Sequence, residues 1–237
     1  MSEPFKFKQF TIHQDRCAMK VGTDGVLLGA WTSLENNPHS ILDIGSGTGL
    51  IALQLAQRSA AQTIDAIELD ENAYEQCVGN FEASDWSDRL FCYHASLQEY
   101  VEELDDTYDL IVSNPPFYTE DFGCVSGTRA MARQEHSLPF EELISSVAKL
   151  LSDQGEFALI IPHKEEENII RLAGQFDLLP KKIMRVKGNP TSATKRSLLQ
   201  FSFTAQELKM EELVIEIGRH EYTPEYQELT QVFYLKM

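Results

Sequence analysis

The sequence lacks the features that mark secreted, membrane-spanning and zinc-binding proteins. Its four cysteines are scattered, with no CxxC pair and no cluster of His and Cys at zinc-ligand spacing. The first residues contain no apolar core of a secretory signal, and no apolar run approaches the ~20 residues that a membrane-spanning helix needs. We therefore expect a cytoplasmic protein with reduced cysteines, no bound metal and no membrane contact. Nothing in the sequence points to an obligatory protein partner.

Positive charge is also scarce. The chain has 20 Lys and Arg residues against 37 Asp and Glu residues, for a net charge of −17 at pH 7. Such a field repels polyanions and argues against non-specific binding to nucleic acid. Residues 181–196 depart from this, because they include no acid and six bases: Lys181, Lys182, Arg185, Lys187, Lys195 and Arg196. A run of charge is most often a solvated face, but in so acidic a chain this stretch is also a candidate for contact with phosphate.

From residue 40 onward, short apolar runs alternate with helical patterns. This alternation is typical of an α/β protein whose mostly parallel sheet carries helices on both faces. We expect strands at 41–44, 63–69, 90–94, 108–112, 156–161, 178–186, 198–203 and, less clearly marked, 213–217. We expect helices at 48–58, 71–83, 97–104, 138–151, 164–175 and 224–234. The length fits a single domain, residues 1–237, in which residues 40–237 form the core and residues 1–39 an N-terminal appendage that covers the sheet.

A glycine-rich segment follows the first of these core strands. The strand leads through Asp43 into Gly45-x-Gly47-x-Gly49 and then into a helix, so a ligand can approach the backbone closely at a helix N-terminus. The spacing lacks the third glycine of the dinucleotide pattern GxGxxG. It suits S-adenosylmethionine (AdoMet), which carries a carboxylate where a dinucleotide carries pyrophosphate. Glu68 lies 23 residues after Gly45, where an acid at the end of the next strand can bind both ribose hydroxyls. The alternative is a glycine-rich turn without a ligand.

The strand expected at 108–112 leads into Asn114-Pro115-Pro116-Phe117. An amine on an aromatic ring is a poor nucleophile because its lone pair is delocalised, and acceptors aimed at its hydrogens localise that pair. Asn114 supplies a side-chain oxygen, and Pro115 a carbonyl whose direction the fixed φ of proline helps to set. Pro116 stiffens the turn, and Phe117 offers a face on which a base can stack. The alternative is a structural Pro-Pro turn.

Two other segments are candidates for the same site. Lys20 and Thr23 precede the sheet, and we expect them to close over the methionine end of AdoMet; Thr23 or Asp24 could instead cap the helix that follows. Arg129 and Arg133 are four residues apart on a loop or short helix after the Pro-Pro turn, which suits contact with phosphate. A structural ion pair with a nearby glutamate is an equally good use of either arginine.

Over nearly its whole length the chain resembles the class I AdoMet-dependent methyltransferases, and more narrowly the bacterial tRNA (adenine-N6)-methyltransferases that act beside the anticodon of a valine tRNA. The glycine loop and the Asn-Pro-Pro-Phe segment are shared across the class. The narrower likeness lies in the segments from Lys20 to Gly25, Tyr222 to Tyr226 and Phe233 to Met237. The resemblance implies a Rossmann-like sheet of seven strands, the last reversed, with residues 1–39 covering the cofactor site.

The resemblance also implies roles for individual residues. Asp43, Gly45, Gly47 and Gly49 match the AdoMet loop, Glu68 the ribose acid, and residues 114–117 the target-amine site. The substrate would be tRNA, modified at the exocyclic N6 of an adenosine. One departure matters: many class members bind the adenine of the cofactor with an acid after the third strand, where this chain has Ala95 and Ser96. Ser96 or a backbone carbonyl would have to replace that acid.

Three other functions compete with this one. Protein-glutamine N5-methyltransferases of the release-factor type share the Asn-Pro-Pro-aromatic motif, but they resemble a longer chain with an additional helical domain. DNA adenine methylation is disfavoured because no separate target-recognition domain is present. A catalytically silent AdoMet-binding adaptor is the third alternative, against which the intact Asn114 argues.

Overall fold

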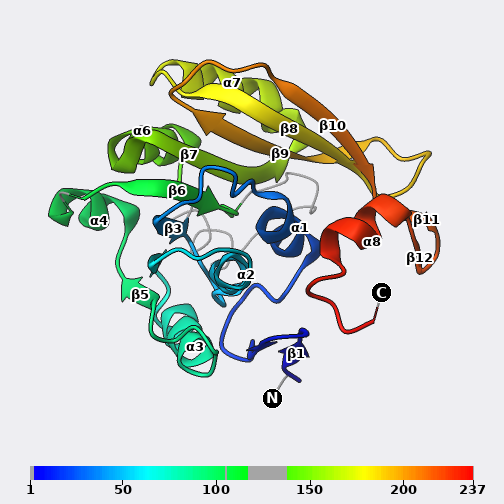
Figure 1. Ribbon diagram of the computed structural model, residues 1–237, viewed down its shortest axis with the longest axis horizontal. Helices are drawn as coiled ribbons and strands as arrows, with labels where there is room; N and C mark the ends of the chain where they lie inside the picture. Colours follow the sequence, from blue (N-terminus) through cyan, green and yellow to red (C-terminus); the bar gives the residue numbers. More distant parts are fainter. Residues whose placement is uncertain (1–2, 105, 117–137, 237) are drawn as a thin grey trace, which may run out of the picture.

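The computed structural model describes residues 3–104, 106–116 and 138–236 and shows an α/β fold built on a mixed sheet (Figure 1). Eight strands follow one another in the order β10-β8-β9-β7-β6-β3-β4-β5. They are β3 (Ser40–Ile44), β4 (Thr63–Glu68), β5 (Leu90–His94), β6 (Tyr108–Ser113), β7 (Leu151–Pro162), β8 (Leu179–Lys187), β9 (Thr194–Ser202) and β10 (Lys209–Val214). The short strands β1 (Phe5–Lys6), β2 (Thr11–Ile12), β11 (Glu216–Gly218) and β12 (Glu221–Tyr222) form two separate hairpin-like pairs.

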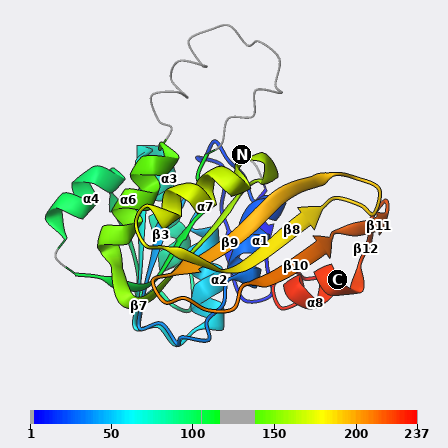
Figure 2. The ribbon, with the colours of Figure 1, turned by 90° about the horizontal axis from the view of Figure 1, so that it is seen from above.

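The reversed strand expected from the resemblance is β9, which pairs antiparallel with both β7 and β8. The expected total of seven strands was wrong, because β10 adds an eighth, parallel to β8 at the edge of the sheet. Figure 2 shows β8, β9 and β10 running side by side. Our weakest strand prediction, at 213–217, overlaps the end of β10 and most of β11.

Helices cover both faces of the sheet, as expected. They are α1 (Thr23–Trp31), α2 (Leu50–Arg58), α3 (Glu71–Glu82), α4 (Leu97–Glu103), α6 (Phe140–Leu150), α7 (Glu166–Gly174) and α8 (Pro224–Thr230). One buried cluster includes residues of α1, α2, α3 and α8, and a second those of α4, α6 and α7, so these sets lie on opposite faces (Figure 1). With both faces covered, the central strands are almost wholly apolar, and β6 buries five of its six residues.

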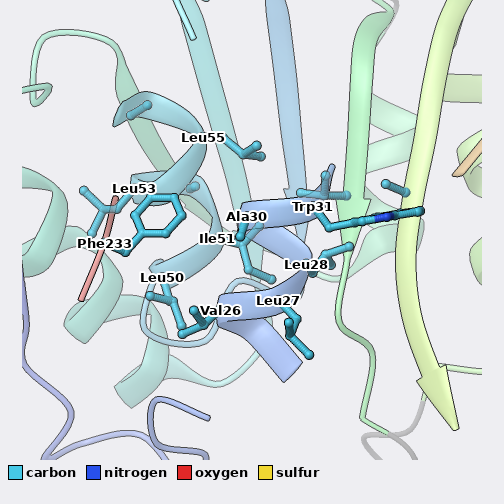
Figure 3. Packing of buried hydrophobic residues seen from close by; sticks show 14 of the residues in the cluster. Val26, Leu27, Leu28, Ala30, Trp31, Leu50, Ile51, Leu53, Leu55 and Phe233 are labelled. Atoms are coloured by element: carbon cyan, nitrogen blue, oxygen red, sulfur yellow. The ribbon is translucent and has the colours of Figure 1, made fainter. Parts of the chain in front are cut away.

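Helix α1 belongs to the core rather than lying loosely over it. Seven of its nine residues are buried, and Figure 3 shows α1 lying beside α2, with Val26 close to Leu50. A Cβ on Gly29 would lie 2.3 Å from Gln54 Oε1, so the two helices approach closely only because this residue is glycine. The alternative in which Thr23 or Asp24 caps this helix was wrong, because the N-cap is Gly22 and no side chain caps the helix. Asp24 instead forms an ion pair with Arg196.

The two ends of the chain meet. Phe7 forms an isolated antiparallel bridge with Tyr234, and the backbone N–H of Lys8 donates to the carbonyl of Phe233 at 2.8 Å. The Lys8 ammonium also donates to the carbonyl of Gln231 at 2.6 Å. The beginning and end of the chain therefore lie together beside α2 and α8 (Figure 1).

Candidate active site

The sequence-predicted site residues lie at one edge of the sheet. Strands β3, β4, β6 and β7 are parallel neighbours, so their carboxyl ends point the same way. The glycine loop leaves β3, Glu68 ends β4, and Asn114 follows β6. The hydroxyl of Ser113 donates to the carbonyl of Ile44 at 2.9 Å, which ties the end of β6 directly to the start of the glycine loop.

The glycine loop has the conformation that its residues predict. Gly45, Gly47 and Gly49 have φ values of 72°, 56° and 77°, in the region that favours glycine. A Cβ on Gly49 would lie 2.5 Å from Phe81 and 2.8 Å from the sulfur of Cys77, so this glycine lets the loop pack against α3. At Gly45 and Gly47 a Cβ would meet nothing within 4 Å. The loop therefore presents bare backbone to open space, as a closely bound cofactor requires.

Glu68 faces this loop. Its Oε2 accepts a hydrogen bond from the Gly47 N–H at 2.8 Å, and its Oε1 accepts one from the Asp70 N–H at 2.9 Å. These two bonds fix the carboxylate, and each oxygen keeps a further lone pair for a hydroxyl. The arrangement fits a ligand with two adjacent hydroxyls lying over the loop, as the ribose of AdoMet would.

Asp43 lies beneath the loop and is fully buried. Its Oδ2 accepts from the Ala52 N–H at 3.2 Å, which joins the end of β3 to the first turn of α2. Burial raises the pKa of Asp43 to about 7; the hydrogen bond from Ala52 opposes this rise, and the charge of Glu68 adds to it. Asp43 therefore holds the loop in place from below and sits close enough to Glu68 to sense its charge.

The Asn-Pro-Pro turn begins at this edge. Asn114 is half-buried, Pro115 is buried and Pro116 is exposed. The structure thus places Asn114 at the end of the strand next to β3, within the same edge as Glu68. Phe117, Arg129 and Arg133 lie outside the described residues.

The N-terminal segment runs along the other side of the loop. The side chain of Asn80, on α3, donates to the carbonyls of His13 at 3.0 Å and Thr48 at 2.9 Å and accepts from the His13 N–H at 2.9 Å. One amide thereby joins the N-terminal segment to the glycine loop. Sequence reasoning missed it, because a polar residue on an amphipathic helix carries no signal of this kind.

Cys17 shows how closely this segment approaches the ribose acid. Burial raises the pKa of Cys17 to about 12, and the nearby charges of Glu68, Asp70 and Asp15 add to the rise. Lys20 and Thr23, a few residues further on, are exposed at the start of α1. Their contact with the methionine end of the cofactor remains a prediction.

Ser96 serves the protein's own helix. Its hydroxyl accepts from the Glu99 N–H at 3.2 Å and donates to Glu99 Oε2 at 2.7 Å, forming a capping box at the start of α4. This engagement favours the backbone over the Ser96 side chain as the group that would contact the cofactor's adenine.

Five of the six bases in residues 181–196 are matched by carboxylates: Lys181 by Glu156 at 2.6 Å, Lys182 by Glu211 at 3.3 Å, Arg185 by Glu166 at 2.6 Å, Lys187 by Glu212 at 2.8 Å and Arg196 by Asp24 at 2.8 Å. These acids come from elsewhere in the sequence. Residues 181–196 therefore contain no acid, but in the folded protein acids of other segments lie beside them. These ion pairs do not test whether the six bases contact RNA, and that contact stays a prediction.

The six bases also do not form one surface. The Lys182 ammonium lies 4.7 Å from the ring centre of Trp31, on α1, and Arg196 pairs with α1 as well. Arg185 instead pairs with Glu166, the first residue of α7, on the opposite face. Lys195 is exposed.

In the part of the chain that the structure describes, no helix has both the length and the apolar content to cross a membrane. Within the same residues, no three His, Cys, Asp or Glu side chains gather as metal ligands would.

Comparison with known proteins identifies the family of the chain. Residues 25–179 match the methyltransferase small domain family. A tRNA1(Val) (adenine(37)-N6)-methyltransferase from Flavobacterium psychrophilum is 62% identical over 98% of this chain and 100% of its own length. Proteins of the same name from Christiangramia forsetii and Bacteroides fragilis are 58% and 44% identical, over 100% of this chain and 99% and 100% of their own lengths.

A solved structure, a predicted O-methyltransferase from Agrobacterium tumefaciens, superposes with a TM-score of 0.67 at 20% identity and covers 89% of this chain and 96% of its own. At that identity the likeness supports the fold alone. The full-length relatives support more, and with the glycine loop and its acid they show that the chain is an AdoMet-dependent enzyme of the methyltransferase small domain family, in the group of the tRNA1(Val) (adenine(37)-N6)-methyltransferases.

Proposed function

We propose that this enzyme methylates the exocyclic N6 of adenosine 37 in tRNA1(Val), as the names of its full-length relatives state for them. The observation that carries the proposal is the position of Asn114. It directly follows β6, the strand beside β3 and its glycine loop, and is tied to that loop through Ser113. An amine held by Asn114 would therefore lie next to the methyl donor.

The residues divide the work between cofactor and target. Glu68 would hold the ribose hydroxyls, and the backbone of Gly45 and Gly47 the methionine part, with Lys20 and Thr23 closing over it. AdoMet supplies a methyl group that its sulfonium already activates, so the protein has mainly to align the two reactants. The Asn114 side chain and the Pro115 carbonyl would accept hydrogen bonds from the amine, while Phe117 stacks on the base. Pro116 stiffens the turn that presents these groups.

We further propose where RNA meets the protein. Lys195 is exposed at the amino end of β9, which lies beside the carboxyl end of its antiparallel neighbour β7 and close to the proposed base pocket. Arg129 and Arg133 follow the Asn-Pro-Pro-Phe segment in sequence and would add phosphate contacts. Lys181, Lys182, Arg185, Lys187 and Arg196 would contribute mainly by holding β8 and β9 in place. We place the enzyme in the cytoplasm, where its tRNA substrate would be met.

The proposal can be tested in an extract from a strain that lacks the enzyme. The extract is incubated with the protein and labelled AdoMet, then treated separately with ribonuclease and with protease. We expect label that ribonuclease removes and protease does not, and N6-methyladenosine after digestion to nucleosides. Label removed only by protease would instead support the protein-glutamine alternative, and no label above background would support a silent adaptor. Any other methylated nucleoside would refute the N6 target.

A further inference from the structure

A partly buried polar cluster lies at the carboxyl end of β7, one strand away from Asn114. We call its members, His163, Glu166, Arg185 and Ser197, the His163 cluster. His163 follows β7 directly, and its Nδ1 lies 2.9 Å from the hydroxyl of Ser197 and 3.1 Å from Glu166 Oε2. Arg185 donates from Nη2 at 2.6 Å and from Nε at 3.1 Å to Glu166 Oε1. The catalytic groups described above leave this cluster unused.

The hydrogen bonds decide which ring nitrogen of His163 carries a proton. Ser197 donates its one hydroxyl proton to Glu166 Oε2. Burial works to raise the pKa of Glu166, but the hydrogen bonds and charge of Arg185 and the bond from Ser197 outweigh it, so that this pKa lies below its ordinary value. Both groups that face Nδ1 are thus acceptors. Nδ1 therefore holds the proton, and in the neutral ring Nε2 is left as an acceptor.

That acceptor faces outward. The His163 side chain is 36% exposed, whereas that of Glu166 is 5% exposed. Within the described ranges no group bonds to Nε2 of His163. Arg196, the neighbour of Ser197 on β9, turns instead to Asp24 on the other face of the sheet. The ring is therefore held on its inner side and offers one hydrogen-bond acceptor to a ligand at the carboxyl edge.

The register of the strands places this acceptor relative to the target amine. Ser113 pairs with Leu159, so Asn114 is level with Ile160 on the adjacent parallel strand. His163 comes three residues after Ile160, which is a rise of about 10 Å further out along the strand direction. Adenine carries its exocyclic amine and its ribose at opposite ends of the purine. With the amine at Asn114, the ribose would lie towards the outer side of the pocket, where His163 is.

We propose that His163 Nε2 accepts a hydrogen bond from the ribose 2′-hydroxyl of the target adenosine, so that the His163 cluster lets the enzyme distinguish RNA from DNA. The inference rests on the proposed adenosine target. A phosphate offers no proton to an acceptor, whereas the 2′-hydroxyl does, and it is the group that DNA lacks. Glu166, Arg185 and Ser197 act as positioning residues, since they hold the ring and its proton.

The test uses two RNA stem-loops that differ only in carrying adenosine or 2′-deoxyadenosine at the target position. Single-turnover methylation of both is measured with the wild type, His163→Ala and His163→Gln. We expect the wild type to methylate the ribose form about tenfold faster, which corresponds to one partly exposed hydrogen bond. His163→Ala should lose this preference because its rate falls on the ribose form alone. His163→Gln should keep part of it, because its side-chain oxygen can accept.

His39→Ala is the matched control, because the exposed His39 side chain precedes β3 at the opposite edge of the sheet. It should leave the preference unchanged. An equal preference in wild type and His163→Ala would overturn the inference. So would an equal loss on both stem-loops that grows weaker with added salt, since that result identifies a phosphate contact. If the wild type makes no N6-methyladenosine on either stem-loop, the proposed function is refuted, and the inference that rests on it is refuted as well.

Discussion

Replacing Lys181 by alanine would separate a structural role of the basic stretch from contact with RNA. The Lys181 ammonium lies 2.6 Å from Glu156 Oε1, and the two side chains are 13% and 5% exposed. The second oxygen of Glu156 accepts from Gln200, whose own carbonyl oxygen accepts from the Ser33 N–H at 2.9 Å. Lys181 thus neutralises a carboxylate at the centre of a buried network that joins β7, β8, β9 and the end of α1.

The expected cost follows from that burial. Removing one partner of a buried pair leaves an uncompensated charge and costs about 3–5 kcal/mol. Gln200 still donates to Glu156 in the variant, so we expect Lys181→Ala to lower the free energy of unfolding by about 3 kcal/mol, at the lower end of this range. Its affinity for tRNA should keep the wild-type dependence on salt, because the ammonium is already engaged.

Lys195→Ala is the comparison, since Lys195 is exposed. It should change stability by less than about 0.5 kcal/mol but lower the slope of log affinity against log salt by about one. Urea unfolding gives the first quantity, and tRNA binding across a salt series gives the second. If Lys181→Ala unfolded like the wild type while its salt slope fell by about one, Lys181 would be a phosphate contact and the reasoning would be refuted.

Three further predictions concern the active site. Glu68→Ala should weaken binding of S-adenosylhomocysteine by on the order of 2–4 kcal/mol, because a bidentate charged hydrogen bond is lost; unchanged affinity in calorimetry would reject the assignment. Asn114→Ala should keep cofactor affinity while single-turnover methylation falls by about 10²–10³-fold, and near-normal turnover would mean that the turn is structural. The raised pKa of Asp43 should cost wild-type folding about 4 kcal/mol as pH rises from about 4 to about 7, because the folded state keeps a proton that the unfolded chain has released. Asp43→Asn should lack this loss and so gain stability relative to wild type as pH rises; parallel stability curves at pH 5 and pH 8 would contradict it.

The central strands and the glycine loop were predictable because local pattern determines them. Runs of apolar residues gave β3, β4, β5 and β6 to within a residue or two of their ends. Helix α2 begins at Leu50 instead of residue 48, since Gly49 is left-handed and precedes it as the N-cap. Strand β10 was predicted poorly because charged residues make up half of it, whereas β5, at the other edge, begins with four apolar residues in a row. A strand with so many charged residues carries little of the apolar signal on which such predictions depend.

The partners of the basic residues were not predictable, because they depend on distant parts of the chain. Lys181, on β8, pairs with Glu156, on β7, although β9 lies between these strands. Lys182 and Lys187 pair with two acids of the neighbouring strand β10, Glu211 and Glu212. The side-chain contacts of Asn80 and Ser197 depend likewise on the folded arrangement. A linear sequence shows which charges are near one another along the chain, and only the fold shows which are near one another in space.

The meeting of the two chain ends has a consequence for biosynthesis. Phe7 and Lys8 dock on residues 231–234, and the contact between Lys8 and Gln231 spans 223 positions of the sequence. Domains begin to fold during synthesis, but contacts this distant in sequence must wait until both partners have emerged. The N-terminal segment also carries His13 and Cys17 to their places beside the glycine loop and Glu68. One wall of the cofactor site therefore depends on contacts that form only once residues 231–234 have been made, and a chain without these contacts would hold the cofactor poorly.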